Sequence, residues 1–201
     1  VLVQTCGDNK NETCYYPIDM VHRQGLIHSG CVTLVVDNST KQALVIQRGP
    51  DMVTCPLAWT ITGEHTSGIE HAADTSRRNI EEELGPWISQ KVASIQSLAP
   101  DPVFYFRPVY PDGIRQDRQL IYMYVATLSS SWVEIEEEWA EHGKEQDKHE
   151  VYNHRWISIS DLEQWIADDE SKLADFCDVT LTLFFQLMLG IAKKVLQSSA
   201  E

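Results

Sequence analysis

Three polar side chains near the middle of the chain have the spacing of a metal site. Asn79, Glu82 and Glu83 stand at positions i, i+3 and i+4, so a helix would present them on one face. Carboxylates gathered in this way repel one another unless a cation lies among them, and hard divalent ions prefer oxygen ligands. The spacing therefore predicts a site for Mg²⁺ or Mn²⁺ that also contacts substrate phosphates. The alternative is that these glutamates form only the solvated face of a helix.

A helix must position these residues, and the sequence marks both of its ends. Ser67-Gly68-Ile69-Glu70 has the pattern of a capping box, which predicts a helix that begins at Ser67. Gly85-Pro86 predicts its end. The residues between them include a narrow apolar stripe, which consists of Ala72, Ala73, Ile80 and Leu84.

The same stretch resembles the Nudix box, whose pattern is G, five residues, E, seven residues, R-E, an aliphatic residue, any residue, E-E, any residue, G. The aligned positions are Glu64, Glu70, Arg78-Asn79, Ile80, Glu82-Glu83 and Gly85. Glu64 stands where the box has its first glycine, and Asn79 stands where it has the glutamate after the arginine. Because Asn79 is neutral and cannot act as a base, this change affects the expected rate of catalysis more than the fold.

The resemblance implies roles for the box residues. In Nudix proteins the box holds divalent metal against a diphosphate, which implies that Glu82 and Glu83 bind the metal and take part in catalysis. Glu70 is a further candidate metal ligand, with two alternatives: it pairs with Arg78 to brace the loop, or it only caps its own helix. Arg78 is also a candidate for binding the substrate.

A second resemblance concerns the residues before the box. Val21–His28, which is V-H-R-Q-G-L-I-H, is similar to the H-R-x-G-L-x-H entry of the Nudix branch that includes isopentenyl-diphosphate isomerase. That branch has a hairpin before this entry, and residues 1–6 and 13–16 predict one here. The alternative for His22 and His28 is that they satisfy local backbone groups.

Further candidate residues lie on predicted strands. Arg48 follows a strand at a point where Nudix proteins often bind substrate phosphates, and an exposed strand-end charge is the alternative. The isomerase-like branch has a metal-binding glutamate near the start of the strand predicted at Leu120–Ala126, and the matching residue here is Gln119. Asp117 lies on the same strand face and is the predicted substitute ligand. Glu150 opens a run similar to the closing strand of Nudix domains, which implies a catalytic place near the metal.

The pattern of elements predicts an α+β fold, and the resemblance implies the Nudix α/β/α sandwich with a mixed sheet. Residues 1–170 are expected to form the Nudix domain, and residues 171–201 a helical extension packed on it. Asp178 is the predicted N-cap of a final helix, Val179–Leu196. The uncharged stretch of this helix is too short for a membrane span. If its apolar stripe is exposed and does not pack on the domain, the stripe is expected to form a homodimer.

Other elements follow from local patterns. Ser160 is expected to cap a helix, and Glu134–Asp147 to form a solvated helix or loop. The remaining predictions are a hairpin of Cys31–Val36 and Gln42–Gln47 about residues 37–40, a strand within Ser89–Leu98 and an edge strand at Val103–Arg107.

Charge and cysteine content limit the classes of function. The 201 residues carry a net charge of −14 at pH 7, which argues against binding of long nucleic acid or an anionic membrane. Five cysteines match no zinc spacing, so most are expected to be reduced, with Cys6 and Cys14 placed to face one another across a hairpin. No signal peptide is visible, which slightly favours the cytoplasm, although the start at Val1 and sequons at Asn11 and Asn38 leave secretion open.

The expected function is metal-dependent hydrolysis of a diphosphate linkage in a nucleoside-diphosphate-type or related small molecule, in which the metal neutralises the diphosphate and activates water. One alternative is a Nudix fold retained for binding or regulation, because Asn79 and Gln119 both replace expected carboxylates. The other is isopentenyl-diphosphate isomerase. That enzyme has a cysteine before the box helix, and residues 59–65 contain none.

Overall fold

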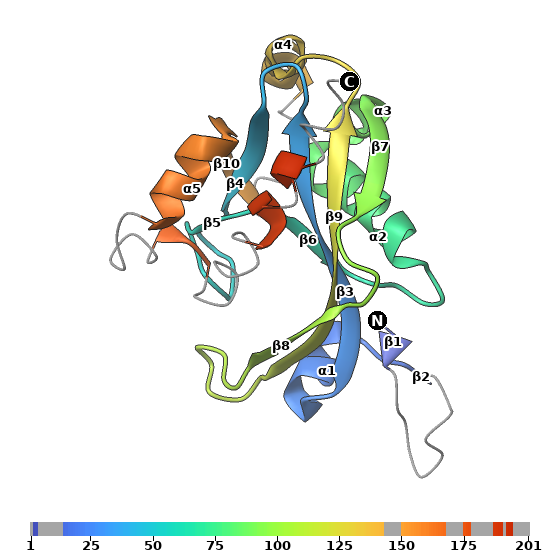
Figure 1. The fold of residues 1–201 in the computed structure, drawn as a ribbon. Coiled ribbons are helices and arrows are strands. Elements are labelled where there is room, and N and C mark those ends of the chain that lie inside the picture. The colour runs from blue at the N-terminus through green and yellow to red at the C-terminus, as the bar shows by residue number, and fades with distance from the viewer. Residues whose placement is uncertain are drawn as a thin grey trace.

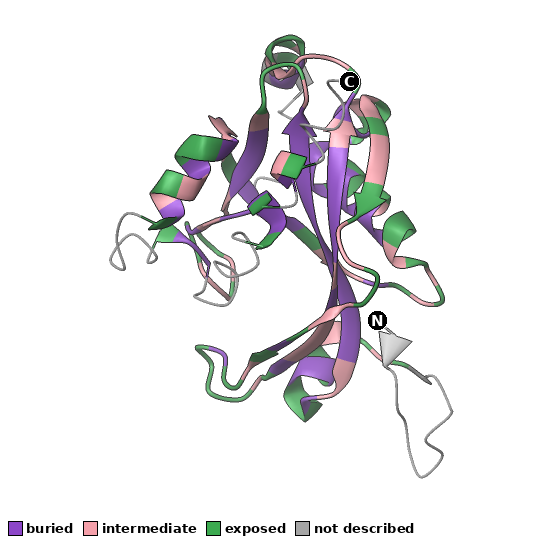
Figure 2. Ribbon diagram, in the orientation of Figure 1, coloured by how far each residue is buried: buried purple, intermediate pink, exposed green. Residues whose placement is uncertain are grey.

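The core of the protein is a mixed β-sheet built on two long strands (Figure 1). The computed structural model describes residues 2–3, 14–142, 150–167, 175–177, 187–190 and 192–194. Strands β3 (Ile27–Asp37) and β9 (Asp117–Leu128) pair in parallel along residues 27–36 and 118–127. Figure 2 shows both strands buried along most of their length, as expected for central strands covered on both faces.

On its other side, β3 changes partner along its length. Gly30 to Thr33 pair antiparallel with β6, whereas Val36 and Asp37 pair with β4. The strand β4 therefore diverges from β3, β6 pairs with β3 in its place, and residues of both β4 and β6 line the candidate site. The other strand bounds are β1 (Leu2–Val3), β2 (Cys14–Tyr15), β4 (Gln42–Arg48), β5 (Trp59–Thr60), β6 (Thr62–His65), β7 (Val92–Ser97), β8 (Val103–Arg107) and β10 (Val151–Ser158).

Helices cover both faces of the sheet. The helix bounds are α1 (Ile18–Gln24), α2 (Ala72–Asn79), α3 (Pro86–Gln90), α4 (Trp132–His142) and α5 (Ile159–Ala167), with a π-helical turn, Ile80–Leu84, between α2 and α3. Val32, Leu34 and Val36 pack in the core cluster that contains α5 residues, whereas Val35 packs in the cluster with the π-helical turn. Figure 1 shows α5 on the opposite side of the sheet from α2 and α3. The α+β class and the α/β/α sandwich are thus confirmed.

The box helix begins later than the sequence predicts. The helix α2 starts at Ala72, and Ser67–Glu70 forms a turn in which the Glu70 N–H donates to the Ser67 carbonyl at 3.1 Å. Gly68 takes a positive φ of 59°, which a helix does not allow. The predicted helix start at Ser67 is therefore wrong, although Glu70 Oε2 accepts the Ser67 N–H at 3.2 Å, as in a capping box, and Arg78 also holds the Glu70 side chain.

Several local predictions are confirmed and two need correction. The β3–β4 hairpin, the β1–β2 pair and the edge strand β8 all form, and the turn of the β1–β2 pair lies outside the described residues. The predicted strand at 89–98 begins only at Val92, because Pro86 starts the short helix α3. The cap of α5 is Ser158 and not Ser160, since the Ser158 Oγ accepts the Asp161 N–H at 3.0 Å.

Two cysteines that were expected to be reduced form a disulfide. Cys55, in the loop before β5, is bonded to Cys177 across 122 positions of sequence. Cys31, in β3, has a free, buried thiol. Cys6 lies outside the described residues, so the predicted placement of Cys6 opposite Cys14 stays a prediction.

Two described pieces of the C-terminal segment are helical and pack in the core. Residues 187–190 and 192–194 are helical, and Met188, Leu189 and Ala192 are buried in the same cluster as α5 residues. Asp178 and most of the predicted helix lie outside the described residues. The domain boundary near residue 170 and the homodimer therefore stay predictions. Among the described helices, none is long and apolar enough to cross a membrane.

We expect Asp37 to anchor α4 to the sheet. Burial raises the pKa of Asp37, but hydrogen bonds from Ser39, Trp132 and Thr40 outweigh this and lower it below 3.8. The Trp132 N–H donates to Asp37 Oδ2 at 2.9 Å. Asp37→Asn should therefore lower the free energy of unfolding at pH 7 by about 1.5–3 kcal/mol, the range for a hydrogen bond to a charged group.

The pH dependence gives this prediction its sign. A carboxylate with a lowered folded-state pKa stabilises the fold above its unfolded pKa of about 3.9, and this contribution is lost as the pH falls through the folded-state pKa. The difference between wild type and Asp37→Asn in urea denaturation should thus shrink as the pH falls below about 4. The exposed Asp51→Asn is the control, and a difference independent of pH would contradict the prediction.

Candidate active site

A cavity of about 250 Å³ opens where β4 diverges from β3 and β6 pairs with β3 instead. Its walls come from segments far apart in sequence, which the sheet brings together. The charged and polar residues that line it are Arg48, Thr54, Thr60, Glu64, His65, Glu83, Tyr105, Arg107, Tyr110, Asp117, Gln119 and Glu150. Four of the residues predicted as site residues, Arg48, Glu83, Asp117 and Glu150, therefore border the same space.

Three carboxylates meet at one side of this cavity. Glu83 comes from the π-helical turn and is 9% exposed, Glu64 comes from β6, and Glu150 precedes β10. Burial, together with the charges of Glu150 and Glu64, raises the pKa of Glu83 to about 8, against the opposing effects of Asn79 and Arg48. A buried carboxyl among other acids is stabilised either by a proton or by a cation. The cluster therefore fits a hard divalent ion.

Glu64 remains ionised beside Glu83. Burial raises the pKa of Glu64, but the hydrogen bond and charge of His65 and the charge of Arg78 outweigh this and lower it. Glu64 Oε1 accepts the backbone N–H of His65 at 2.6 Å. The cavity thus holds a negative charge whose orientation is fixed by the neighbouring peptide group.

A second cluster of possible ligands lies beside the carboxylates. His22, His28 and His65 come from α1, β3 and β6, and each places a ring nitrogen within 4.8 Å of the others. Asp117 Oδ1 lies 3.5 Å from His28 Nε2 and 3.9 Å from His22 Nε2. Among the described residues these three buried atoms have no hydrogen-bond partner. Orphaned imidazole nitrogens beside a carboxylate oxygen fit a transition-metal ion.

The protonation state of the histidines agrees with a role as ligands. Burial, followed by the neighbouring His65, lowers the pKa of His28 to about 4, and burial also lowers that of His22. Metal binding requires the neutral imidazole. The His28 Nδ1 lies 3.0 Å from the Leu26 carbonyl, so His28 does satisfy a local backbone group, which is the alternative given for it above. The same contact directs His28 Nε2 toward the cluster.

Gln119 holds two members of this cluster in place. Its Nε2 donates to Asp117 Oδ2 at 2.8 Å and lies 3.2 Å from His65 Nε2. Tyr110 also donates to Asp117 Oδ2, at 3.2 Å. Asp117 therefore lies in the cavity with its Oδ2 held by two donors, and its role as the substitute ligand for Gln119 stays a prediction. Glu64 and His65 were missed, although their place at the start of the box was the available signal.

Three other box residues form a brace outside the cavity lining. Arg78 Nε and Nη2 each donate to Glu70 at 3.1 Å, and Nη2 also donates to the His65 carbonyl at 2.9 Å. Arg78 Nη1 donates to Glu82 Oε2 at 2.9 Å, and the Glu82 side chain is 54% exposed. The box thus divides into Glu83, which faces the cavity, and a salt-bridged loop that positions His65.

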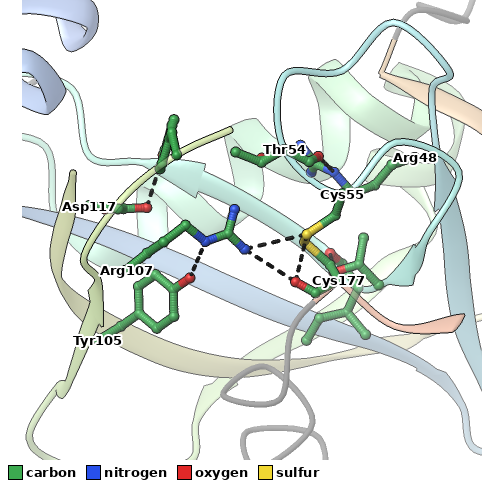
Figure 3. The surroundings of a disulfide bond; sticks show 10 residues. Arg48, Thr54, Cys55, Tyr105, Arg107, Asp117 and Cys177 are labelled. Atoms are coloured by element: carbon green, nitrogen blue, oxygen red, sulfur yellow. Dashed lines mark hydrogen bonds between the residues drawn. A yellow bond between two sulfur atoms is a disulfide. The ribbon is translucent and has the colours of Figure 1, made fainter. Parts of the chain in front are cut away.

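Two arginines provide positive charge in the same cavity. Arg48 is anchored by hydrogen bonds to the carbonyl and hydroxyl of Thr54, at 3.0 and 3.3 Å. Figure 3 shows Arg107 extending from β8 to the disulfide, where it contacts Tyr105, Cys55 and Cys177. The disulfide therefore fixes the wall of the cavity that carries Arg107.

The comparison with protein families agrees with this geometry. Residues 28–176 match the model of the NUDIX domain. The chain belongs to the Nudix family. Nudix hydrolases generally use divalent metals, and among the described residues the histidine cluster of this Nudix protein could hold such an ion. Arg48, Glu83 and Glu150 lie within the matched region.

A solved structure shares the fold at low sequence identity. DR0079 from Deinococcus radiodurans is 16% identical, with a TM-score of 0.52 over 79% of this chain and 81% of that chain. A NUDIX hydrolase from Nitrosomonas europaea is 10% identical, with a TM-score of 0.48 over 80% of this chain and 87% of that chain. No curated protein matches this Nudix chain.

We expect the Arg78 brace to contribute to stability. Arg78→Gln removes a bidentate contact to Glu70 and the contact to the His65 carbonyl, and should lower the free energy of unfolding by about 1–3 kcal/mol. Urea denaturation measures this loss. Arg77→Gln, an exposed arginine on the same helix, is the matched control and should change stability little. Equal losses in the two variants would contradict the assignment of a brace.

We also expect the disulfide to stabilise the fold. The Cys55→Ser/Cys177→Ser variant should lose about 2–5 kcal/mol of unfolding free energy, because the bond closes a long loop. Denaturation without reductant tests this. Alkylation of the unreduced wild type followed by mass spectrometry is the control. Modification of Cys55 in folded, unreduced protein would show that the bond is absent.

Proposed function

We propose that this Nudix protein is a divalent-metal-dependent hydrolase of a diphosphate linkage, acting on a nucleoside-diphosphate-type or related small molecule. The observation that supports this most strongly is the buried Glu83 carboxylate beside Glu64 and Glu150. Their mutual repulsion favours a cation, and Arg48 and Arg107 on the same cavity supply charge complementary to phosphate.

Residues of the cavity divide the chemical work. A bound Mg²⁺ or Mn²⁺ would neutralise the diphosphate and lower the pKa of an attacking water. Glu83 and Glu150 would hold the ion, and Glu150, which is exposed at the cavity, would accept the proton of the attacking water. Arg48, fixed by Thr54, orients the phosphate oxygens.

The imidazole cluster supports a second ion position. Imidazole ligands prefer transition metals such as Zn²⁺, Fe²⁺ or Mn²⁺ over Mg²⁺. His22 and His28, the residues of the isomerase-like entry, both belong to this cluster, so we retain that branch as the proposed place of the chain within the family. The isomerase reaction is not proposed, because Trp59–His65 contains no cysteine.

Each of the two amides that suggested lost catalysis lies beside a carboxylate that remains. Gln119 donates to Asp117, and Asn79 lies beside Glu83 and lowers its pKa against the effect of burial. Both amides therefore support carboxylates that remain, which favours a hydrolase over a binding protein without activity.

The disulfide also bears on location. Disulfides persist mainly in oxidising compartments. We therefore infer that the chain works in such a compartment, in contrast to the slight preference of the sequence for the cytoplasm.

The test is a hydrolysis assay on a panel of nucleoside-diphosphate-linked compounds with Mg²⁺ or Mn²⁺, read by chromatography of the products. We expect activity that a chelator abolishes and that Glu83→Gln lowers by at least about a hundredfold. Glu81→Gln, an exposed neighbour with the same change in charge, should retain activity. No metal-dependent product from any compound, or full activity in Glu83→Gln, would refute the proposal.

A further inference from the structure

Glu64 occupies the position at which the Nudix box has glycine, and its carboxylate lies in the cavity. We propose that Glu64, in place of Glu82, is the carboxylate that binds the divalent cation together with Glu83 and Glu150. This assignment rests on the proposed function, since it concerns the ion that the hydrolase requires.

The backbone at Glu64 holds this side chain without strain. Glu64 pairs with Cys31 in the β3–β6 ladder, and both residues line the cavity. Its φ is not among the positive values of the described residues, so the conformation here does not require the glycine of the box. The His65 N–H holds Glu64 Oε1 at 2.6 Å, as hydrogen bonds commonly orient metal ligands.

Glu82 is placed for a different role. Its side chain is 54% exposed, it accepts a hydrogen bond from Arg78, and it does not line the cavity. The ion pair with Arg78 already neutralises the negative charge that Glu82 would need as a metal ligand. The π-helical turn carries Glu83 inward and leaves Glu82 on the solvent side.

Charge balance in the cavity supports the exchange. Asn79 removes one negative charge from the box helix, next to Glu83, and Glu64 adds one negative charge from β6. The negative charge around Glu83 is therefore moved from the helix to the strand, and its total is unchanged.

An observation independent of the carboxylates also indicates a cation in this cavity. Asp117, which is 6% exposed and lines the same cavity, has an Oδ1 atom without a hydrogen-bond partner among the described residues, as does the fully buried His28 Nε2. His65 connects this cluster to Glu64, because its Nδ1 lies 3.7 Å from Glu64 Oε1. Glu64 thus stands between two groups of atoms that both fit cations.

The experiment measures Mg²⁺ binding from the rise in melting temperature with Mg²⁺ concentration. Mg²⁺ alone is the probe, because imidazole nitrogens bind it poorly and the histidine cluster contributes little. The variants are Glu64→Gln, Glu82→Gln and the exposed control Glu81→Gln, which change charge by the same amount. Glutamine at position 64 keeps the acceptor for the His65 N–H, and circular dichroism confirms that each variant is folded.

We expect Glu64→Gln to weaken Mg²⁺ binding at least about tenfold, and Glu82→Gln and Glu81→Gln to bind as the wild type does. Glu64→Asp keeps the charge and should weaken binding less than Glu64→Gln. Unchanged Mg²⁺ binding in Glu64→Gln, or an equal loss in Glu82→Gln, overturns the assignment and leaves the proposed hydrolase standing. A wild type that Mg²⁺ does not stabilise removes the proposed function together with this assignment.

Discussion

The parallel pairing of β3 with β9 is the constraint on which the site depends. Parallel strands need a long crossover connection, and here that connection carries the box helix and the brace of Arg78. The register sets His28 opposite Gln119, which brings Asp117 within 3.5 Å of His28. On the other edge of β3, the change of partner from β6 to β4 opens the cavity. One strand register therefore positions both ligand clusters.

The fold was predictable because its signals are local or extend over a continuous motif. Alternating β-branched residues on either side of 37–40 mark a hairpin, and the spacing from Glu64 to Gly85 marks the box. Contacts between distant segments carry no such signal. Asp37 is a turn residue by its neighbours, yet it also binds Trp132, 95 positions away, and Cys55 bonds Cys177 across 122 positions. Disulfide connectivity cannot be deduced from cysteine spacing alone.

The site was predictable only in part, because helical spacing does not reveal which face is buried. The i, i+4 relation joins Arg78 to Glu82 as well as Asn79 to Glu83. Burial decides between the two pairs: Asn79 is 0% exposed and Glu83 is 9% exposed, whereas Glu82 pairs with Arg78 near the solvent. The sequence shows that Glu64 replaces the first glycine of the box. It does not show that the Glu64 side chain lies in the cavity.

The departures from the box change the distribution of charge more than its amount. A glutamate at position 79 would add a buried charge beside Glu83, whose pKa is already raised to about 8 by burial and by Glu150 and Glu64. An uncompensated buried charge is strongly destabilising. With Glu64 present, a glutamate at position 79 would add a second repulsive charge beside Glu83. A neutral amide at 79 lessens that repulsion. The same logic applies at Gln119, whose amide donates to Asp117 where a second carboxylate would repel it. The substitutions at 64, 79 and 119 are therefore electrostatically consistent with one another, and they describe an adapted cation site better than a site in decay.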